Sequence, residues 1–218
     1  RAAEHAHEQH LPVVRKTKTG RSTDAAVLVE LAAGSDNPIP KLVLESKREF
    51  ASRYGLQAEY WRHFKPEDSP EVVSDLKSNL RDLANHFHAL YQAPELAADK
   101  PAHFAEAERW YRDYLLSFPK DSDTPPINYQ LADLLLEHQA FGEAALQYER
   151  TAYDYPVHEK SAADGYAVIY AHHQHRKGAP VEQQGSVRTS TVASSLRFAD
   201  AFPQHEHAPA VLGAAADD

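Results

Sequence analysis

Residues 125–156 read PPINYQLADLLLEHQAFGEAALQYERTAYDYP, and this stretch decides the fold. Apolar residues recur at spacings of three and four on both sides of Ala140-Phe141-Gly142, which predicts two amphipathic helices joined by a tight turn. We expect these helices near 127–139 and 143–155. Ala132 and Ala144 are small enough for the helices to cross closely, and Pro156 stops the second helix. The stretch therefore predicts an antiparallel helical hairpin.

The end of this hairpin recurs elsewhere in the chain. The shared pattern is a small residue, an aromatic residue one turn later, and then an aromatic residue followed by proline. It occurs as Ala107-x3-Tyr111-x6-Phe118-Pro119, Ala144-x3-Tyr148-x6-Tyr155-Pro156 and Ser194-x3-Phe198-x3-Phe202-Pro203. Recurrence at irregular distances predicts a stack of divergent helical hairpins, an architecture that favours binding other proteins over catalysis.

The remaining sequence divides around these repeats. We expect residues 1–36 to be a flexible lead-in with one short helix near 25–33, for which a strand is the alternative. Residues 37–69 should form N-terminal helices that pack on the repeats, including one over 57–64. Residues 70–218 hold the divergent repeats, over about 70–119, 120–156 and 157–203, with a partial unit at 204–218. A long helix from Pro70 pairs with one over 102–118, and a third hairpin spans 159–177 and 186–202, joined by a linker from Gly178 to Gly185.

The unit from Pro125 to Pro156 resembles a tetratricopeptide repeat (TPR). The residues that carry the resemblance are Leu131-Ala132, Phe141-x-Glu143-Ala144, Tyr148 and Pro156. The aromatic-proline endings are similar to those of bacterial cell-envelope TPR proteins of the Tol-Pal coordinator and β-barrel assembly lipoprotein type. The resemblance implies an all-α fold of antiparallel hairpins stacked as a right-handed superhelix, or α-solenoid. It also implies a scaffold or adaptor role, in the periplasm or at the outer membrane, with the cytoplasm as the alternative.

Composition excludes several classes of function. The hydrophobic content of 42% with 25% charged residues is that of a globular chain. A net charge of −9 and no concentrated basic face argue against nucleic-acid binding. No apolar run is long enough to cross a membrane, and the absence of cysteine excludes thiolate catalysis. Because the chain also lacks methionine, we expect it to be a fragment of a longer polypeptide.

No catalytic arrangement is visible, and we predict a protein without enzymatic activity or cofactor. Ser161, Asp164 and His172 fall on one predicted helix, which spaces them along a face, whereas a nucleophile, its base and an orienting group must converge on one point. The eight glycines are scattered singly, so there is no phosphate-binding loop.

Fourteen histidines raise the question of metal binding. His172 and His175 have the spacing that places two ligands on one helix face, which makes them weak candidates. They also lie in the last turn of a predicted helix, where cations interact favourably with the exposed carbonyls. His5, His7 and His10 form another group near the N-terminus. A histidine-rich metal-binding module is one alternative function, and a helical regulatory domain of a larger enzyme is another.

The resemblance also implies where a partner binds, because in TPR proteins the first helix of each hairpin lines the concave groove. Matching the best unit and then the next one predicts these groove residues: Tyr129, Asp133, Leu136, Glu137, Asp164, Val168 and His172. The set is acidic and apolar, which predicts a protein or peptide partner with basic residues and apolar anchors. The open C-terminal repeat adds self-association as a further expectation.

Overall fold

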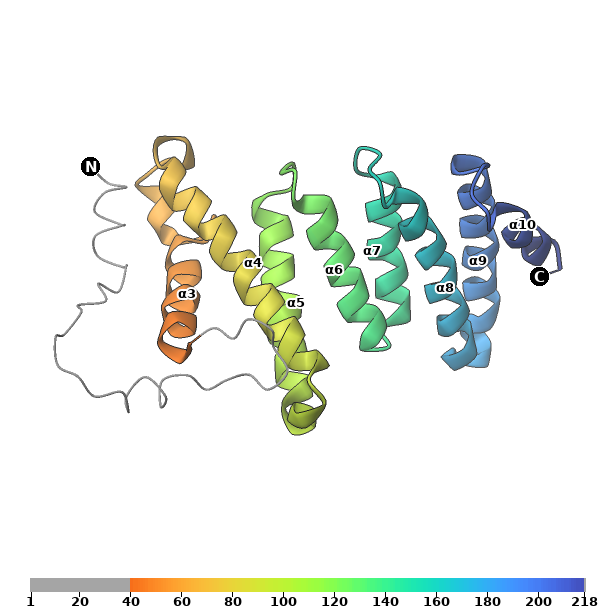
Figure 1. The fold of residues 1–218 in the computed structure, drawn as a ribbon, viewed down its shortest axis with the longest axis horizontal. Helices are drawn as coiled ribbons and strands as arrows, with labels where there is room; N and C mark the ends of the chain where they lie inside the picture. Colours follow the sequence, from red (N-terminus) through yellow and green to blue (C-terminus); the bar gives the residue numbers. More distant parts are fainter. Residues whose placement is uncertain (1–39, 218) are drawn as a thin grey trace. The chain divides into compact units, whose positions relative to one another are not determined.

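A computed structural model describes residues 40–217 of the chain (Figure 1). All regular elements in this range are helical, which confirms the predicted all-α fold. The described part belongs to two compact units, unit 1 ending at Asp121 and unit 2 beginning at Ser122. The helix predicted near 25–33 and the group of His5, His7 and His10 lie outside the described residues. The superhelical course of the stack stays a prediction.

Unit 1 is built on the long helix α4 (Pro70–Gln92) and its partner α5 (Lys100–Ser117). Leu76, Leu80 and Leu83 recur on one face of α4 and have almost no exposed surface. That face is buried because α4 packs against both α5 and α3 (Lys41–Tyr54). The 3₁₀ turns η1 (Glu59–Arg62), η2 (Pro66–Asp68) and η3 (Pro94–Asp99) complete the unit.

The helix predicted over 57–64 is wrong, because only the single turn η1 forms there. A segment this short between Gly55 and Pro66 has too few residues to extend a helix beyond its nucleus. Trp61 in η1 ties this turn to α3. Its indole Nε1 donates to the Tyr54 carbonyl at 2.9 Å, which satisfies a carbonyl at the end of α3.

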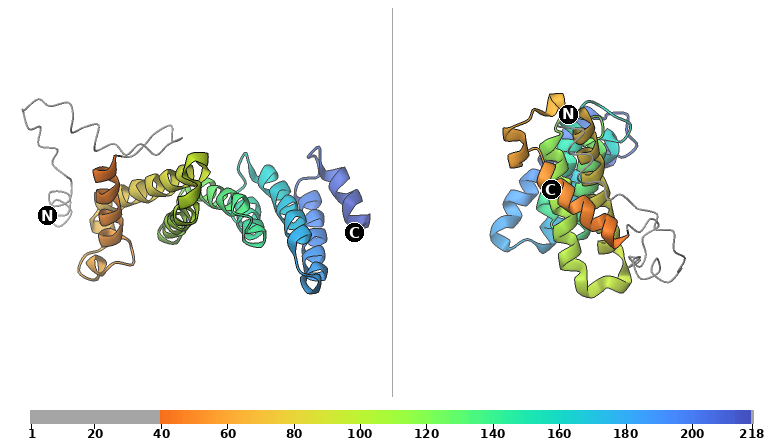
Figure 2. Two further views of the ribbon diagram at one scale, coloured as in Figure 1. Left: turned by 90° about the horizontal axis from the view of Figure 1, so that it is seen from below. Right: turned by 90° about the vertical axis from the view of Figure 1, so that its left-hand side faces the viewer.

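Unit 2 contains five helices that lie side by side in chain order (Figures 1 and 2). They are α6 (Thr124–Glu137), α7 (Phe141–Tyr153), α8 (Ser161–Gly178), α9 (Val181–Ala201) and α10 (Ala208–Asp217). At the crossing of α6 and α7, Ala132 and Ala144 have no exposed surface, and Tyr148 is 2% exposed beside them. The predicted hairpin with small residues at its crossing is therefore present.

The turn between α6 and α7 lies earlier than predicted. Helix α7 already begins at Phe141, so Gly142 is helical. The chain reverses direction at Gln139, whose φ of 64° is left-handed. The Ala140 N–H donates to the Leu135 carbonyl at 2.9 Å, and the Gln139 N–H donates to the Leu136 carbonyl at 3.0 Å. This pair of bonds is a Schellman motif, which satisfies the carbonyls at the end of α6.

The predicted linker between the third pair of helices is also shorter than expected. Helix α9 begins at Val181, directly after Pro180, and Gly185 lies inside it. Proline supplies a backbone angle that suits a helix start, whereas an internal glycine costs only about 1 kcal/mol relative to alanine. Packing of α9 against α8 and α10 outweighs that cost.

Two of the aromatic-proline endings share one backbone conformation. Phe118 ends α5 with φ −128° and ψ 54°, and Phe202 ends α9 with φ −129° and ψ 57°. The following proline disfavours the helical conformation at both residues. The middle ending differs, because α7 stops at Tyr153, two residues before Tyr155. The recurring sequence pattern therefore marks the same backbone conformation at the helix end in two of its three occurrences.

Candidate functional site

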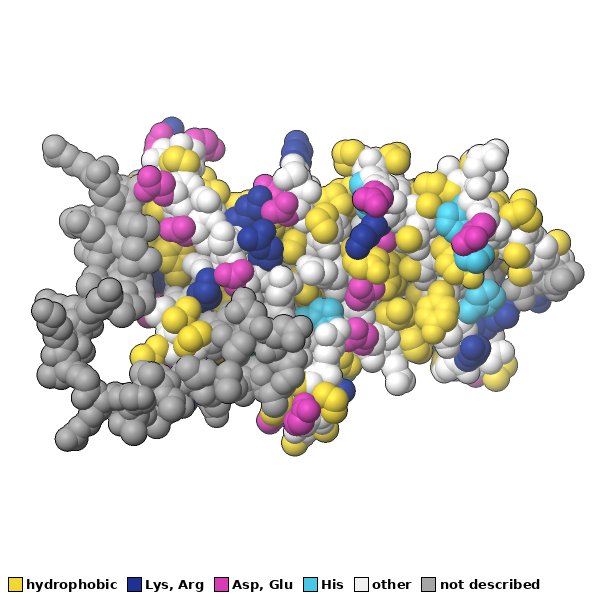
Figure 3. Space-filling view, viewed as in Figure 1, with side chains coloured by type: hydrophobic (Ala, Val, Ile, Leu, Met, Phe, Trp, Pro, Cys, Tyr) yellow, Lys and Arg dark blue, Asp and Glu magenta, His cyan; other side chains and the backbone are white. Residues whose placement is uncertain are grey.

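Unit 2 brings polar side chains from three helices and one loop together. We call this group the acidic–tyrosine cluster. Its members are Tyr129 and Asp133 on α6, Tyr148 on α7, Asp164 on α8, and His158 and Lys160 in the loop between α7 and α8. In Figure 3 acidic side chains lie over α6, and hydrophobic side chains cover neighbouring surface over α8.

The α6 side of the cluster is held by hydrogen bonding and ring packing. The buried Tyr148 hydroxyl donates to Asp133 Oδ1. The Tyr148 and Tyr129 rings meet edge to face, with centroids 5.8 Å apart at an angle of 62°. Because Tyr129 and Asp133 are four residues apart, they lie one helical turn from each other on the same face of α6. A half-buried aromatic ring and a half-buried carboxyl group are therefore neighbours at the surface.

Asp164 is the unusual member of the cluster. Its side chain has no exposed surface, and neither carboxylate oxygen has a hydrogen-bond partner. The imidazole of His158 lies close by, with its Nε2 3.6 Å from Oδ2. Burial raises the pKa of Asp164 to about 6; Asp133 also raises it, whereas His158 and Lys160 act in the opposite direction. At neutral pH the structure therefore holds a buried negative charge without hydrogen bonds.

The loop above Asp164 is fixed through His158. Its Nε2 contacts the Thr151 carbonyl at 3.1 Å, and its Nδ1 accepts from the Lys160 backbone N–H at 3.3 Å. These contacts place a proton on Nε2, already directed to the carbonyl, and leave Nδ1 as an acceptor. The His158 backbone N–H donates to Ser161 Oγ at 2.9 Å. Asp164 thus receives no hydrogen bond from the residue that covers it.

The two tyrosines respond to the same negative charge. Burial raises the pKa of Tyr129, and Asp133 and Asp164 raise it further. The pKa of Tyr148 is raised by burial and by its hydrogen bond to Asp133. Both hydroxyls therefore stay protonated at any physiological pH. The cluster presents neutral aromatic rings and negative carboxylates, a combination suited to attracting a cation.

The structure places the predicted groove residues in different environments. Tyr129 and Asp133 join Asp164 in the cluster, while Leu136 is half-buried and Glu137 is exposed on α6. The expectation that Asp164 and Val168 face an open groove is wrong, because neither has any exposed surface.

His172 is half-buried and lies in a different setting from the cluster. Its pKa is lowered by burial, and its charged neighbours are Glu149, His175 and His173. None of these belongs to the acidic–tyrosine cluster. Its Nδ1 is buried without a hydrogen-bond partner.

The exposed face of α8 carries residues that the groove prediction missed. Tyr166 and Tyr170 are 39% and 50% exposed and stand four residues apart. Asp164 lies two residues before Tyr166, and Val168 lies two residues before Tyr170. At about 100° per residue, a separation of two residues places each pair on roughly opposite sides of the helix. The buried side is dictated by close packing at Gly165, where an added Cβ would lie 2.9 Å from the Tyr153 hydroxyl. The spacing of four residues between the two tyrosines, which places both on one face of a helix, is the sequence signal that could have identified this exposed face.

In the described residues, no group of three or more His, Asp or Glu side chains is arranged to hold a metal ion. Of the two weak candidates, His175 packs its ring against α7, where a Cβ added to Gly142 would lie 3.1 Å from the His175 Cε1 atom. His172 and His175 thus remain a pair of histidines without a third ligand among these residues.

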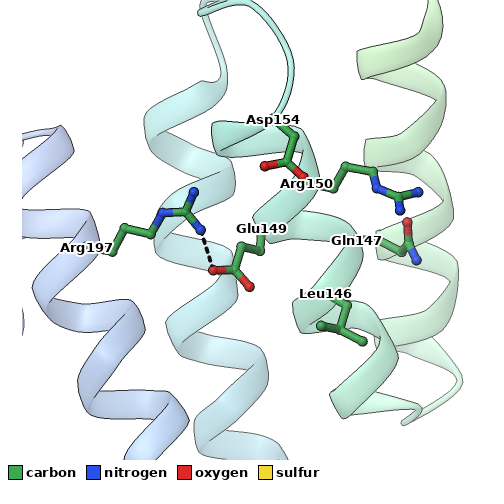
Figure 4. Close-up of a pocket in the computed structure, with 6 residues that line it drawn as sticks. All are labelled: Leu146, Gln147, Glu149, Arg150, Asp154 and Arg197. Carbon is green, nitrogen blue, oxygen red and sulfur yellow. Dashed lines mark hydrogen bonds and ion pairs between the residues drawn. The ribbon is translucent and has the colours of Figure 1, made fainter. Parts of the chain in front are cut away.

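A second surface of unit 2 is a shallow depression of about 380 Å³ between α7 and α9. It is lined by Leu146, Gln147, Glu149, Arg150, Asp154 and Arg197. Figure 4 shows Glu149 and Arg197 pointing toward one another, and their charged atoms lie 2.6 Å apart. Arg197 also stacks over the Tyr153 ring at 3.9 Å. Because these charges already satisfy each other, the acidic–tyrosine cluster is the stronger candidate for binding.

No helix in the described part of the chain is long and apolar enough to cross a bilayer. A scan of protein-family models found no match to the chain, and searches of curated proteins and of solved structures found none either.

Proposed function

We propose that this chain is a non-catalytic adaptor of the TPR type, which binds a basic segment of another protein through the acidic–tyrosine cluster. The observation that carries the proposal is Asp164, a fully buried carboxylate without a hydrogen bond, set beside Asp133 and Tyr129. A charge inside protein is screened less by salt than a charge at the surface, so its field reaches the neighbouring surface. A cationic side chain of a partner gains from that field.

Apolar anchors are available on the same unit. Tyr170 is half exposed on α8, and the Tyr166 ring stacks on His207 with centroids 4.6 Å apart. Exposed aromatic side chains favour protein interfaces because they bury a large area at a small cost in conformational entropy. A partner segment with basic and apolar residues matches both features.

Of the three side chains considered for catalysis, Ser161 has a structural role. Ser161 is 1% exposed, and its hydroxyl accepts from the His158 backbone N–H at the start of α8. The pKa of His172 is lowered by burial, and the side chains that also act on it are Glu149, His175 and His173. By resemblance, we place the adaptor in a bacterial envelope assembly, periplasmic or at the outer membrane through a longer parent chain, with the cytoplasm as the alternative. Self-association through α10 belongs to the same proposal.

A titration with a charged peptide tests the function. The probe is a fluorescein-labelled peptide in which arginine alternates with leucine and glycine, followed by fluorescence polarisation. We expect saturable binding that is absent when glutamate replaces every arginine. The double variant Asp133→Asn, Glu137→Gln should weaken binding by about threefold to tenfold, because each exposed charge contact contributes up to about 1 kcal/mol. An asparagine at position 133 would keep an acceptor for the Tyr148 hydroxyl, so the fold is retained.

The matched control removes two acidic charges elsewhere in unit 2. Glu182 and Asp200 are both exposed on α9, away from α6. The variant Glu182→Gln, Asp200→Asn should bind the arginine peptide as the unchanged protein does. Equal weakening by both double variants would mean that net charge, rather than the cluster, attracts the peptide.

A further inference from the structure

The chain places one of its own cations on the acidic–tyrosine cluster. Lys160 Nζ lies 5.2 Å from the centroid of the Tyr129 ring, within the range of a cation–π interaction. Its charge also acts on Asp164. Lys160 itself is an exposed residue of the loop before α8. A solvated lysine over one aromatic ring is weakly held, since such contacts contribute about 0.5–1 kcal/mol at exposed sites.

The backbone beneath Lys160 does not depend on that contact. The Lys160 N–H donates to His158 Nδ1, and His158 is anchored to the Thr151 carbonyl and to Ser161 Oγ. The ammonium group can therefore leave the Tyr129 ring by side-chain rotation while the loop stays in place.

We infer that Lys160 is an internal stand-in for a basic side chain of the partner, and that a partner arginine displaces it from the face of Tyr129. The inference rests on the proposed function and names the chemistry of the ligand at the same site. Asp133 lies one turn from Tyr129 on α6, so a group over the ring has a carboxyl group next to it. Asp164 has no exposed surface, so it cannot contact a partner side chain and attracts it only through its charge.

Arginine suits this arrangement better than lysine. A planar guanidinium stacks on an aromatic ring while its N–H groups donate in the plane to a carboxylate. An ammonium is compact and strongly hydrated, so it meets the ring or the carboxylate at a greater cost in hydration. The cluster therefore selects arginine over lysine, and Lys160 is a competitor weak enough to be displaced.

Two labelled peptides and three variants test the inference. The peptides are the arginine peptide and the same sequence with lysine in every arginine position. Lys160→Ala removes the competitor and should tighten binding of the arginine peptide by about twofold to fivefold, the equivalent of one exposed cation–π contact. Lys177→Ala is the matched control, because it removes the same charge from an exposed position at the other end of α8. Tyr129→Leu should abolish the preference for arginine over lysine.

The outcomes separate this inference from the proposed function. If the unchanged protein binds the arginine peptide and Lys160→Ala tightens binding no more than Lys177→Ala does, Lys160 is not a competitor and the inference fails alone. Retained arginine preference in Tyr129→Leu also overturns it. If neither the unchanged protein nor Lys160→Ala binds either peptide, the proposed function fails together with the inference. Binding that appears only in Lys160→Ala supports both.

Discussion

Replacing Asp164 by asparagine should stabilise the protein at neutral pH and leave it nearly unchanged in acid. Burial raises the pKa of Asp164 from an ordinary 3.8 to about 6, so the folded state holds this proton more tightly than the unfolded state does. Its contribution to stability is present at low pH and is lost as pH rises from about 4 through 6. At about 1.4 kcal/mol for each pH unit, the ionised carboxylate lowers the free energy of unfolding by about 2–3 kcal/mol at pH 7.5 relative to pH 4. Asparagine does not ionise, so the variant escapes this loss.

Urea unfolding followed by circular dichroism at pH 4 and pH 7.5 measures the effect. The quantity of interest is the stability of Asp164→Asn minus that of the unchanged protein, because contributions from other titrating groups largely cancel in this difference. It should grow by about 2–3 kcal/mol between the two pH values. Asp200→Asn, at an exposed position on α9, is the matched control. A difference that shrinks as pH rises would refute the reasoning, because it would mean that His158 stabilises the carboxylate enough to outweigh burial.

Two further predictions concern backbone positions in unit 2. Gly165→Ala should destabilise the protein by about 1–3 kcal/mol despite the better helix propensity of alanine. The added Cβ would lie 2.9 Å from the Tyr153 hydroxyl, 3.0 Å from Phe202 and 3.1 Å from Phe198. An unchanged or higher melting temperature would contradict this packing. Gln139→Gly should raise the free energy of unfolding by about 1 kcal/mol, because residue 139 has a left-handed φ of 64° that glycine adopts without strain. Urea titration checks it, and a lower midpoint would argue against the Schellman turn.

The hairpin over residues 125–156 could be predicted because its signals are local. Apolar spacing of three and four, prolines at both ends and small residues at the crossing each act within a few residues of their position. Ala132 and Ala144 are fully buried where they were expected. The proximity of Tyr129 and Asp133 could also be predicted, because residues four apart lie on one face of a helix whatever packs around it.

The faces of α8 could not be read in the same way. This helix is packed by α7 on one side and α9 on the other, so its apolar and polar residues show no clean division into one buried and one exposed stripe. Asp164 and Val168 were expected at the surface and are buried, while Tyr166 and Tyr170 are exposed. Placing them requires knowing that Phe198 and Phe202 approach α8 at Gly165 from a distant part of the chain.

The sequence by itself determined how α6 and α7 pair and, apart from residues 57–64 and the start of α9, most of the helical segments. Hydrogen bonding within a helix and contacts between adjacent helices depend on neighbouring residues, which makes them readable from sequence. It also determined that Asp164 is a carboxylic acid near the start of a helix. Only the tertiary structure decided what that acid does. The loop carrying His158 lies against it, α7 supplies the Thr151 carbonyl that accepts the hydrogen bond from His158 Nε2, and α6 places Asp133 nearby. Burial and charge act through space between segments far apart in the chain, so the raised pKa of Asp164 and its proximity to Asp133 arise only once those segments have packed.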